Sequence, residues 1–257
     1  MLRLGMKKHI QRISVFKVFC VTSIFTAVCG AFSAANAKSN ATNRKFVEVR
    51  KYDSLVVYSP NYSRIDLVTG TMPSKGDDRV VFVCEAAFTG KLLESFEHSN
   101  VAGHHVCDGV FYEGYDCAPN NGVFTWSKTG GWKFFDCDHE GSEVPLRAVA
   151  KQDGMGFCQN LLFLGGQRKK GCFKPDARNQ YRALCELDGK LCVIDCARAL
   201  CFKSFMDGLQ SLGVKNAIYL DMGPGWNYSW LRNSDGSVKE LFNVPGKYTT
   251  NWITFYR

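Results

Sequence analysis

The sequence predicts an α+β fold, in which a mixed β-sheet forms the core, helices flank it, and a single domain follows an export signal. Short apolar runs typical of strands recur along the chain, and one helical repeat of apolar residues stands between two of them. A length of 257 residues, with 46% hydrophobic content, is enough for one sizeable core. No sequence repeat or linker divides the chain.

The first 37 residues have the pattern of an export signal. Five basic residues between Arg3 and Lys17 precede an apolar run from Val18 to Ala35, and Ala35-Asn36-Ala37 fits a small-x-small cleavage site. A retained signal anchor is the alternative, but polar residues interrupt the run, which is short against the roughly 20 apolar residues of a spanning helix. We expect a signal peptide over residues 1–37, a domain over residues 38–257, and export to the periplasm or the extracellular space with no stable membrane span.

Most of the net positive charge belongs to this signal. The full chain carries +8, and removing residues 1–37 takes away five basic side chains and no acidic one, which leaves +3. The basic run Arg168-Lys169-Lys170 reads as a solvated loop. The charge pattern therefore predicts no nucleic-acid partner.

Several segments outside the signal predict strands. Residues 103–132 are rich in Gly, Asn, Tyr and Trp and indicate irregular strands and loops that could wall a cleft. Within them, Asn120-Asn121-Gly122 predicts a turn ahead of a strand. The predicted strands, each bounded by polar or turn residues, are Phe46–Val49, Ser54–Tyr58, Arg79–Val83, Val123–Trp126 and Asn251–Tyr256.

A strand, a helix and a second strand follow one another in the last third of the chain. The strands are Lys190–Asp195 and Ala217–Leu220, and apolar residues at helical spacing predict a helix over Leu200–Leu212 between them. If the strands are parallel neighbours joined by a right-handed crossover, Asp195 and Asp221 lie at the same edge of the sheet. Open sheets bind their ligands at such an edge.

Asp221 leads this second strand into a glycine-rich turn. Gly223 and Gly225 let the backbone bend sharply and approach a ligand, which a Cβ would obstruct. Trp226, Tyr228 and Trp230 follow this turn. Their aromatic rings are flat and apolar and carry a polar group, and sugars stack on rings of this kind. The alternative interpretation is that Asp221 caps a turn and the aromatic residues belong to the core.

These residues resemble the phosphodiester glycosidase domain family, whose animal member removes N-acetylglucosamine from a phosphodiester and whose bacterial members are associated with exopolysaccharide. The similarity covers about Phe82 to Arg257. Met222 and Pro224 stand where the family has glycines, and Trp226-Asn227 where it has a small residue, so the turn is stiffer and bulkier here. The family's Leu-Asp-Gly-Gly-Gly-Ser-like motif corresponds to Leu220–Gly225, and its Arg-Thr-Ala strand corresponds to Arg182–Leu184. Its glutamine followed by a glycine turn corresponds to Gln159–Gly166, and its apolar strand with a polar end corresponds to Cys84–Gly90.

The resemblance implies an exported hydrolase that cleaves a glycosidic or sugar-1-phosphodiester bond in a glycan or envelope polysaccharide, with no cofactor and no metal. Either Asp221 or Glu85 would act as the general acid, the other carboxylate would direct water or stabilise the developing positive charge, and Arg182 would bind the phosphate. The other residues assigned to substrate binding are Gln159, Asp195, Gly223, Gly225, Trp226, Asn227 and Tyr228. The alternative is a non-catalytic carbohydrate-binding or envelope-associated protein on the same fold.

Ten of the twelve cysteines follow the signal, an even number that is compatible with disulfides in an exported protein. The natural candidates are the loop residues Cys107, Cys117 and Cys137, whereas strand cysteines fit as small buried side chains. Zinc binding is conceivable near His104 and His105, but no regular ligand spacing supports it. A serine hydrolase is disfavoured because the G-x-S-x-G motif is missing, and no spacing reveals a histidine partner for a reactive cysteine.

Overall fold

The computed structural model describes residues 45–89, 101–114, 122–137, 141–171, 173–222, 228–243 and 251–257. They all lie in one compact unit, Asn43–Arg257. In this part of the chain, no helix is long and apolar enough to cross a membrane. The predicted signal peptide and the Gly223, Gly225, Trp226 and Asn227 predictions lie outside the described residues.

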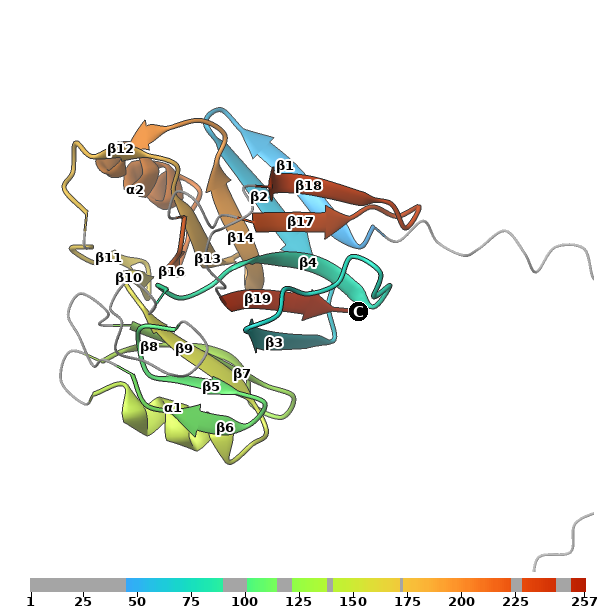
Figure 1. The fold of residues 1–257 in the computed structure, drawn as a ribbon. Helices are drawn as coiled ribbons and strands as arrows, with labels where there is room; N and C mark the ends of the chain where they lie inside the picture. Colours follow the sequence, from blue (N-terminus) through green and yellow to red (C-terminus); the bar gives the residue numbers. More distant parts are fainter. Residues whose placement is uncertain are drawn as a thin grey trace, which may run out of the picture. The chain divides into compact units, whose positions relative to one another are not determined.

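The first sheet has seven strands and carries most of the candidate site (Figure 1). Its order is β1-β2-β14-β13-β16-β10-β11. The strands are β1 (Val47–Tyr52), β2 (Leu55–Pro60), β10 (Leu161–Leu164), β11 (Gln167–Arg168), β13 (Arg182–Leu187), β14 (Lys190–Cys196) and β16 (Asn216–Leu220). A separate two-stranded ribbon pairs β12 (Arg178–Asn179) with β15 (Leu200–Cys201).

Two five-stranded sheets complete the described fold. The second sheet has the order β18-β17-β4-β19-β3 and consists of β3 (Arg64–Thr69), β4 (Val80–Glu85), β17 (Tyr228–Arg232), β18 (Val238–Asn243) and β19 (Asn251–Tyr256). The third has the order β6-β5-β9-β7-β8 and consists of β5 (His105–Cys107), β6 (Val110–Tyr112), β7 (Gly122–Ser127), β8 (Gly131–Asp136) and β9 (Met155–Gln159).

Two short helices accompany the sheets. Helix α2 (Phe202–Ser211) buries Phe202, Phe205, Met206 and Leu209 in an apolar cluster with strands of the first sheet. Helix α1 (Glu143–Ala150) lies along the third sheet (Figure 1) and buries Leu146 and Val149 there. Its other face is solvated.

The fold is therefore nearly all-β, which corrects the α+β expectation. The predicted mixed sheet is also wrong, because every strand pair among the described residues is antiparallel. The parallel-neighbour prediction for β14 and β16 fails for a local reason. A tight turn at Asp188-Gly189, both at positive φ (53° and 70°), folds β13 directly onto β14. Because β2 occupies the other side of β14, β16 pairs with β13 instead.

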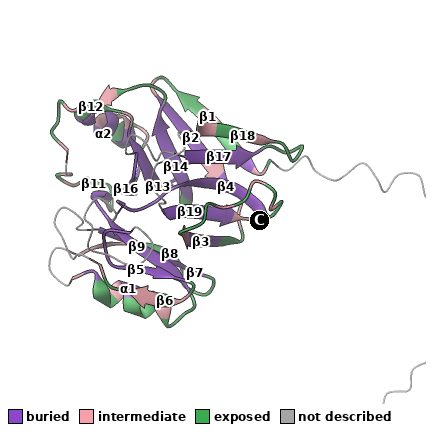
Figure 2. Cartoon of the chain, in the orientation of Figure 1, coloured by how far each residue is buried: buried purple, intermediate pink, exposed green. Residues whose placement is uncertain are grey.

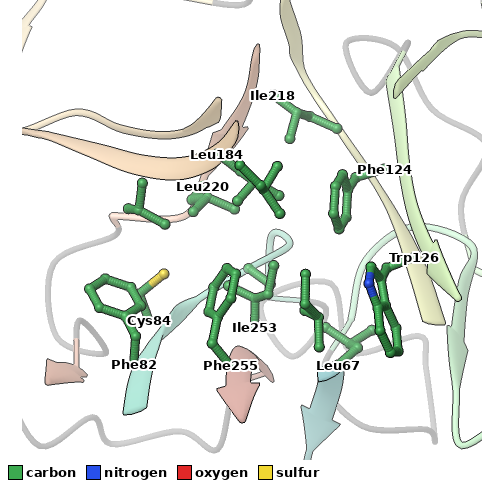
Figure 3. Close-up of a cluster of buried hydrophobic side chains, with 14 of the residues drawn as sticks. Leu67, Phe82, Cys84, Phe124, Trp126, Leu184, Ile218, Leu220, Ile253 and Phe255 are labelled. Carbon is green, nitrogen blue, oxygen red and sulfur yellow. The ribbon is translucent and has the colours of Figure 1, made fainter. Parts of the chain in front are cut away.

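One apolar core joins the three sheets (Figure 3). The first sheet contributes Leu184, Ile218 and Leu220, and the third contributes Phe124 and Trp126. The second sheet contributes Leu67, Phe82, Cys84, Ile253 and Phe255. Figure 2 shows β4, β13, β14 and β19 buried along most of their length, and the strand-end residues Glu85, Arg182 and Asp195 are buried as well.

Several local predictions are confirmed. Strand β19 has the predicted bounds, and β7 exceeds its predicted range by one residue at each end. Helix α2 is shorter than Leu200–Leu212, because Leu200 and Cys201 pair with β12 as a short strand. Strand β3 was not predicted from the sequence, although RIDLVT alternates apolar with charged or polar residues, the pattern of a half-buried strand.

Candidate functional site

The candidate site lies at strand ends that register brings together. Glu85 ends β4, and Arg182 begins β13. On the first sheet, Arg182 is directly opposite Asp195 of β14 on one side and Leu220 of β16 on the other. Asp221 follows Leu220, so Asp195 and Asp221 are at the same end of this sheet although β13 separates their strands.

Arg182 is the centre of a buried hydrogen-bond network. Its Nε and Nη2 donate to the two carboxylate oxygens of Asp195 at 2.6 and 2.9 Å, a bidentate arrangement. Nη1 donates to Oε2 of Glu85 at 3.2 Å, and Nη2 also donates to Oγ of Ser229 at 3.0 Å. The ring of Phe242 lies 5.3 Å from the guanidinium carbon. The planar fork predicted to bind phosphate is thus already occupied by Asp195.

Burial makes the charges in this network interdependent. The Arg182 and Glu85 residues are 0% exposed and Asp195 is 2% exposed. Burial alone would lower the pKa of Arg182, but the charge and hydrogen bonds of Asp195 outweigh it and keep that pKa above its ordinary value. One guanidinium with two ionised carboxylates would leave a net buried negative charge, which is costly in an apolar interior.

The environment of Glu85 favours its neutral form, which would avoid this cost. Burial raises the pKa of Glu85 well above its ordinary value, Arg182 opposes the shift, and the charges of Asp221 and Asp195 add to it. The backbone N–H of Tyr228 donates to Oε1 of Glu85 and holds the side chain in place. A buried neutral carboxylic acid is suited to donating a proton.

Asp221 lies close to Glu85. Its backbone N–H donates to the carbonyl of Ala86, the residue after Glu85, at 3.0 Å. Asp221 is 4% exposed and its charge contributes to the pKa shift of Glu85. The two carboxylates that the sequence singled out, 136 positions apart, therefore belong to one cluster.

Gln159 ends β9 beside β16. Its Oε1 accepts a hydrogen bond from the N–H of Asn160 at 2.8 Å, and the carbonyl of Asn160 accepts from the N–H of Tyr219 at 2.8 Å. Gln159 is fully buried, and its Nε2 has no hydrogen-bond partner among the described residues. An unmatched buried donor is costly, so this amide group is available for a ligand or a bound water.

Tyr228 has a different environment from the one predicted for a stacking residue. Its backbone binds Glu85, and its side chain packs in a buried cluster with Trp230 and Trp252, with the Nζ of Lys75 5.2 Å from the centre of its ring. Only 9% of the residue is exposed. The other residues predicted in this turn, from Gly223 to Asn227, lie outside the described part of the chain.

A cleft of about 450 Å³ reaches the network from the side of Asp195. Its lining includes Tyr58, Gln180, Lys239 and Phe242. Burial raises the pKa of Tyr58, and the charge of Asp195 raises it further, so the phenol stays neutral. The cleft gives solvent a path toward the network on this side.

Sequence reasoning did not assign several residues of the site. Ser229 was within the aromatic segment singled out, and only the contact with Arg182 shows its role. Asn251 is fully buried, accepts from the N–H of Ala87 at 2.8 Å and donates to its carbonyl at 3.1 Å, which fixes the chain after Glu85. Nothing in its sequence context signals this contact.

The cysteine and histidine predictions have mixed outcomes. Cys107 is a buried strand residue with a free thiol that donates to the carbonyl of Leu67 at 3.1 Å, so its prediction as a disulfide-forming loop residue is wrong. Cys117 lies outside the described residues. Nδ1 of His104 accepts from the N–H of Gly114 at 2.8 Å, and the described residues contain no group of three metal-binding side chains. Burial raises the pKa of the Cys84 thiol, which argues against a nucleophilic thiolate beside Arg182.

The raised pKa of Glu85 predicts a pH dependence of stability. Below about pH 4.3, the usual pKa of an unfolded-state glutamate, both states are protonated and the stabilisation is complete. As the pH rises toward the folded-state pKa, the unfolded state loses its proton first, so stability falls by up to about 1.4 kcal/mol per pH unit. Relative to Glu85→Gln, the wild-type free energy of unfolding should fall between pH 4 and pH 7, as urea titrations would measure.

Glu186→Gln supplies the matched control, because Glu186 is a partly buried residue of β13 that binds Asn216 outside the network. Its free-energy difference from wild type should lack this downward trend. A difference between wild type and Glu85→Gln that stayed flat or rose with pH would show that Glu85 is ionised in the folded protein.

Comparisons with known proteins extend the resemblance found in the sequence. The fold matches the catalytic domain of zebrafish N-acetylglucosamine-1-phosphodiester alpha-N-acetylglucosaminidase, auto-inhibited by its pro-peptide, with a TM-score of 0.52, 14% identity and 85% coverage of each chain. It also matches a hypothetical protein from Synechocystis, with a TM-score of 0.55 and 12% identity over 82% of this chain and 61% of that one. A scan against protein-family models finds no match, and a search of the curated proteins finds none either.

Proposed function

We propose that the protein is a hydrolase that cleaves the glycosidic bond of a sugar-1-phosphodiester, with a carbohydrate or sugar phosphate as its substrate. The observation that carries the proposal is the fully buried Glu85, with a pKa that burial raises, beside Asp221 and the Arg182 network. The fold of the zebrafish enzyme adds support, since the name of that enzyme describes this chemistry.

In this mechanism Glu85 gives its proton to the glycosidic oxygen as the bond from that oxygen to the anomeric carbon breaks. Asp221 accepts a proton from the water that attacks the anomeric carbon, which yields the free sugar and a phosphomonoester. Solvent then returns a proton to Glu85 and removes one from Asp221. The unmatched Nε2 of Gln159 supplies a hydrogen bond to substrate.

Arg182 and Asp195 have supporting roles in this proposal. Asp195 orients the guanidinium through two hydrogen bonds, and the guanidinium in turn orients Glu85. Arg182 is thus a positioning residue, and phosphate recognition falls to other groups. Backbone N–H groups of the glycine turn at Gly223 and Gly225 remain the predicted candidates.

A non-catalytic carbohydrate-binding protein is the second candidate, and a specific observation favours it. Glu85 is completely buried and Asp221 nearly so, whereas a catalytic pair must reach the substrate. This candidate requires binding without turnover.

Incubation of the purified protein with a panel of sugar-1-phosphodiesters and simple aryl glycosides distinguishes the two candidates. Chromatography should detect a free sugar, and ³¹P NMR a phosphomonoester, from at least one diester. Binding without products, measured by calorimetry on the same panel, would overturn the hydrolase and support the carbohydrate-binding protein.

A further inference from the structure

The chain that follows Glu85 is held by Asn251, the first residue of β19. Strands β4 and β19 lie side by side (Figure 1), and Glu85 at the end of β4 is directly opposite Trp252. One position further on, the N–H of Ala86 donates to the backbone carbonyl of Asn251 at 3.2 Å. Backbone hydrogen bonding between the two strands therefore continues one residue past Glu85.

The side chain of Asn251 then takes the place of a further strand residue. Its Oδ1 accepts a hydrogen bond from the N–H of Ala87 at 2.8 Å, and its Nδ2 donates to the carbonyl of Ala87 at 3.1 Å. One acceptor and one donor thus meet the same residue, as they do between opposite residues of antiparallel strands. Asn251, Ala86 and Ala87 are fully buried, so the side-chain amide satisfies two backbone groups that would otherwise be costly to bury.

The same segment reaches the second carboxylate of the candidate site. The carbonyl of Ala86 accepts a hydrogen bond from the N–H of Asp221 at 3.0 Å. Asn251 therefore holds Ala86 and Ala87 from one side, and Asp221 is attached to Ala86 on the other. The position of Glu85 relative to Asp221 depends on this short segment of main chain.

The contacts of the Glu85 carboxyl group depend on that main-chain position. Arg182 and the backbone N–H of Tyr228 donate to its two oxygens. The titratable groups that influence it are Arg182, Asp195, Asp221 and Cys84. A displacement of the main chain after Glu85 would move the carboxyl group relative to all of them, and a misplacement of about 1 Å can cost about 100-fold in rate.

We propose that Asn251 is a positioning residue for Glu85 and Asp221, acting through its hydrogen bonds to Ala86 and Ala87. The proposal rests on the proposed function, because it assigns Asn251 to the same reaction. Its role in that reaction is to hold the acid and the second carboxylate at a fixed separation.

Asn251→Ala tests the proposal, because it leaves the N–H and the carbonyl of Ala87 without their buried partner. The pKa of Glu85, followed by ¹³C NMR of its carboxyl carbon and assigned from the loss of that signal in Glu85→Gln, should fall toward the ordinary value of about 4.3, since water enters the loosened segment. On a diester that the wild type cleaves, kcat should fall about 10- to 100-fold with KM little changed. A residue that only stabilised the fold would change the unfolding curve and leave both quantities as in the wild type.

Asn216→Ala is the matched control. The amide of Asn216 also accepts from a backbone N–H, that of Gly165 at 2.8 Å, and donates to Glu186, outside the candidate site. This variant should keep the wild-type kcat and the wild-type pKa of Glu85. If Asn251→Ala does not fold, Asn251→Ser, which keeps a side-chain oxygen as an acceptor, replaces it in both measurements.

Hydrogen exchange of the wild type tests the contact without a variant, because the N–H of Ala87 should be strongly protected. Exchange of this N–H as fast as in an exposed loop, or a folded variant at position 251 with the wild-type kcat or Glu85 pKa, would overturn the proposal. The exchange and the pKa need no turnover. A lowered pKa in a protein that cleaves no diester would therefore reject the hydrolase and retain the effect of Asn251 on Glu85, whereas an active Asn251→Ala with unchanged kcat would reject only the role of Asn251.

Discussion

Glu85→Gln should lower kcat for a sugar-1-phosphodiester by about 10²- to 10⁴-fold, the usual contribution of a positioned general acid. The amide has nearly the same shape as the carboxyl group but has no proton to give to the leaving oxygen. Burial raises the pKa of Glu85 and so favours the acid form, and the substitution removes the proton donor that the mechanism uses first. Initial rates at saturating substrate measure the effect.

Asp221→Asn should cause a comparable loss, because it keeps the side-chain volume and removes the charge that accepts a proton from water. Glu186→Gln should leave kcat within a few-fold of wild type, and unfolding curves should show that all three variants fold. If Glu85→Gln or Asp221→Asn retained wild-type turnover, the residue concerned would have no role in the chemistry.

Arg182→Met should destabilise the protein by about 3–5 kcal/mol, the cost of leaving buried charge without its partner. The substitution keeps the length of the side chain but removes the donors to Asp195, Glu85 and Ser229. Urea unfolding measures the change. Asp195→Asn added to Arg182→Met should recover part of the loss, because it removes the stranded negative charge.

The matched control for this variant is Arg178→Met, four residues earlier on β12, where the exposed guanidinium donates to the carbonyl of Ala199 at 3.2 Å. It should cost less than about 1 kcal/mol. Equal costs at positions 178 and 182 would mean that the buried network contributes nothing beyond an exposed contact.

Local sequence signals predicted individual elements well and their assembly poorly. The run Asn251–Tyr256 predicted β19 with its observed bounds, and Gly213, at a positive φ of 80°, follows α2. The local Asp188-Gly189 turn pairs β13 with β14, but the pairing of β16 with β13 depends on which strand edges are already paired, and no local sequence signal encodes it. The predicted mixed sheet failed for this reason.

The candidate site shows the same division between local and tertiary information. Carboxylates that end apolar strands were identifiable from sequence, and the structure places Glu85 and Asp195 against one arginine, with Asp221 close to Glu85. The binding of the Arg182 guanidinium to Asp195 was not identifiable from sequence, because it depends on the register between two strands and on burial. A sequence pattern reports neither, so the arginine was expected to bind phosphate.

Hydrolysis of a sugar-1-phosphodiester in ¹⁸O-labelled water tests the central claim most directly, because it reports which bond breaks. Attack of water on the anomeric carbon, directed by Asp221 with Glu85 as the acid, predicts a phosphomonoester that contains no ¹⁸O by mass spectrometry and by ³¹P isotope shift. Incorporation of ¹⁸O into the phosphomonoester would show that water attacks phosphorus, and would contradict a glycosidase mechanism at this site.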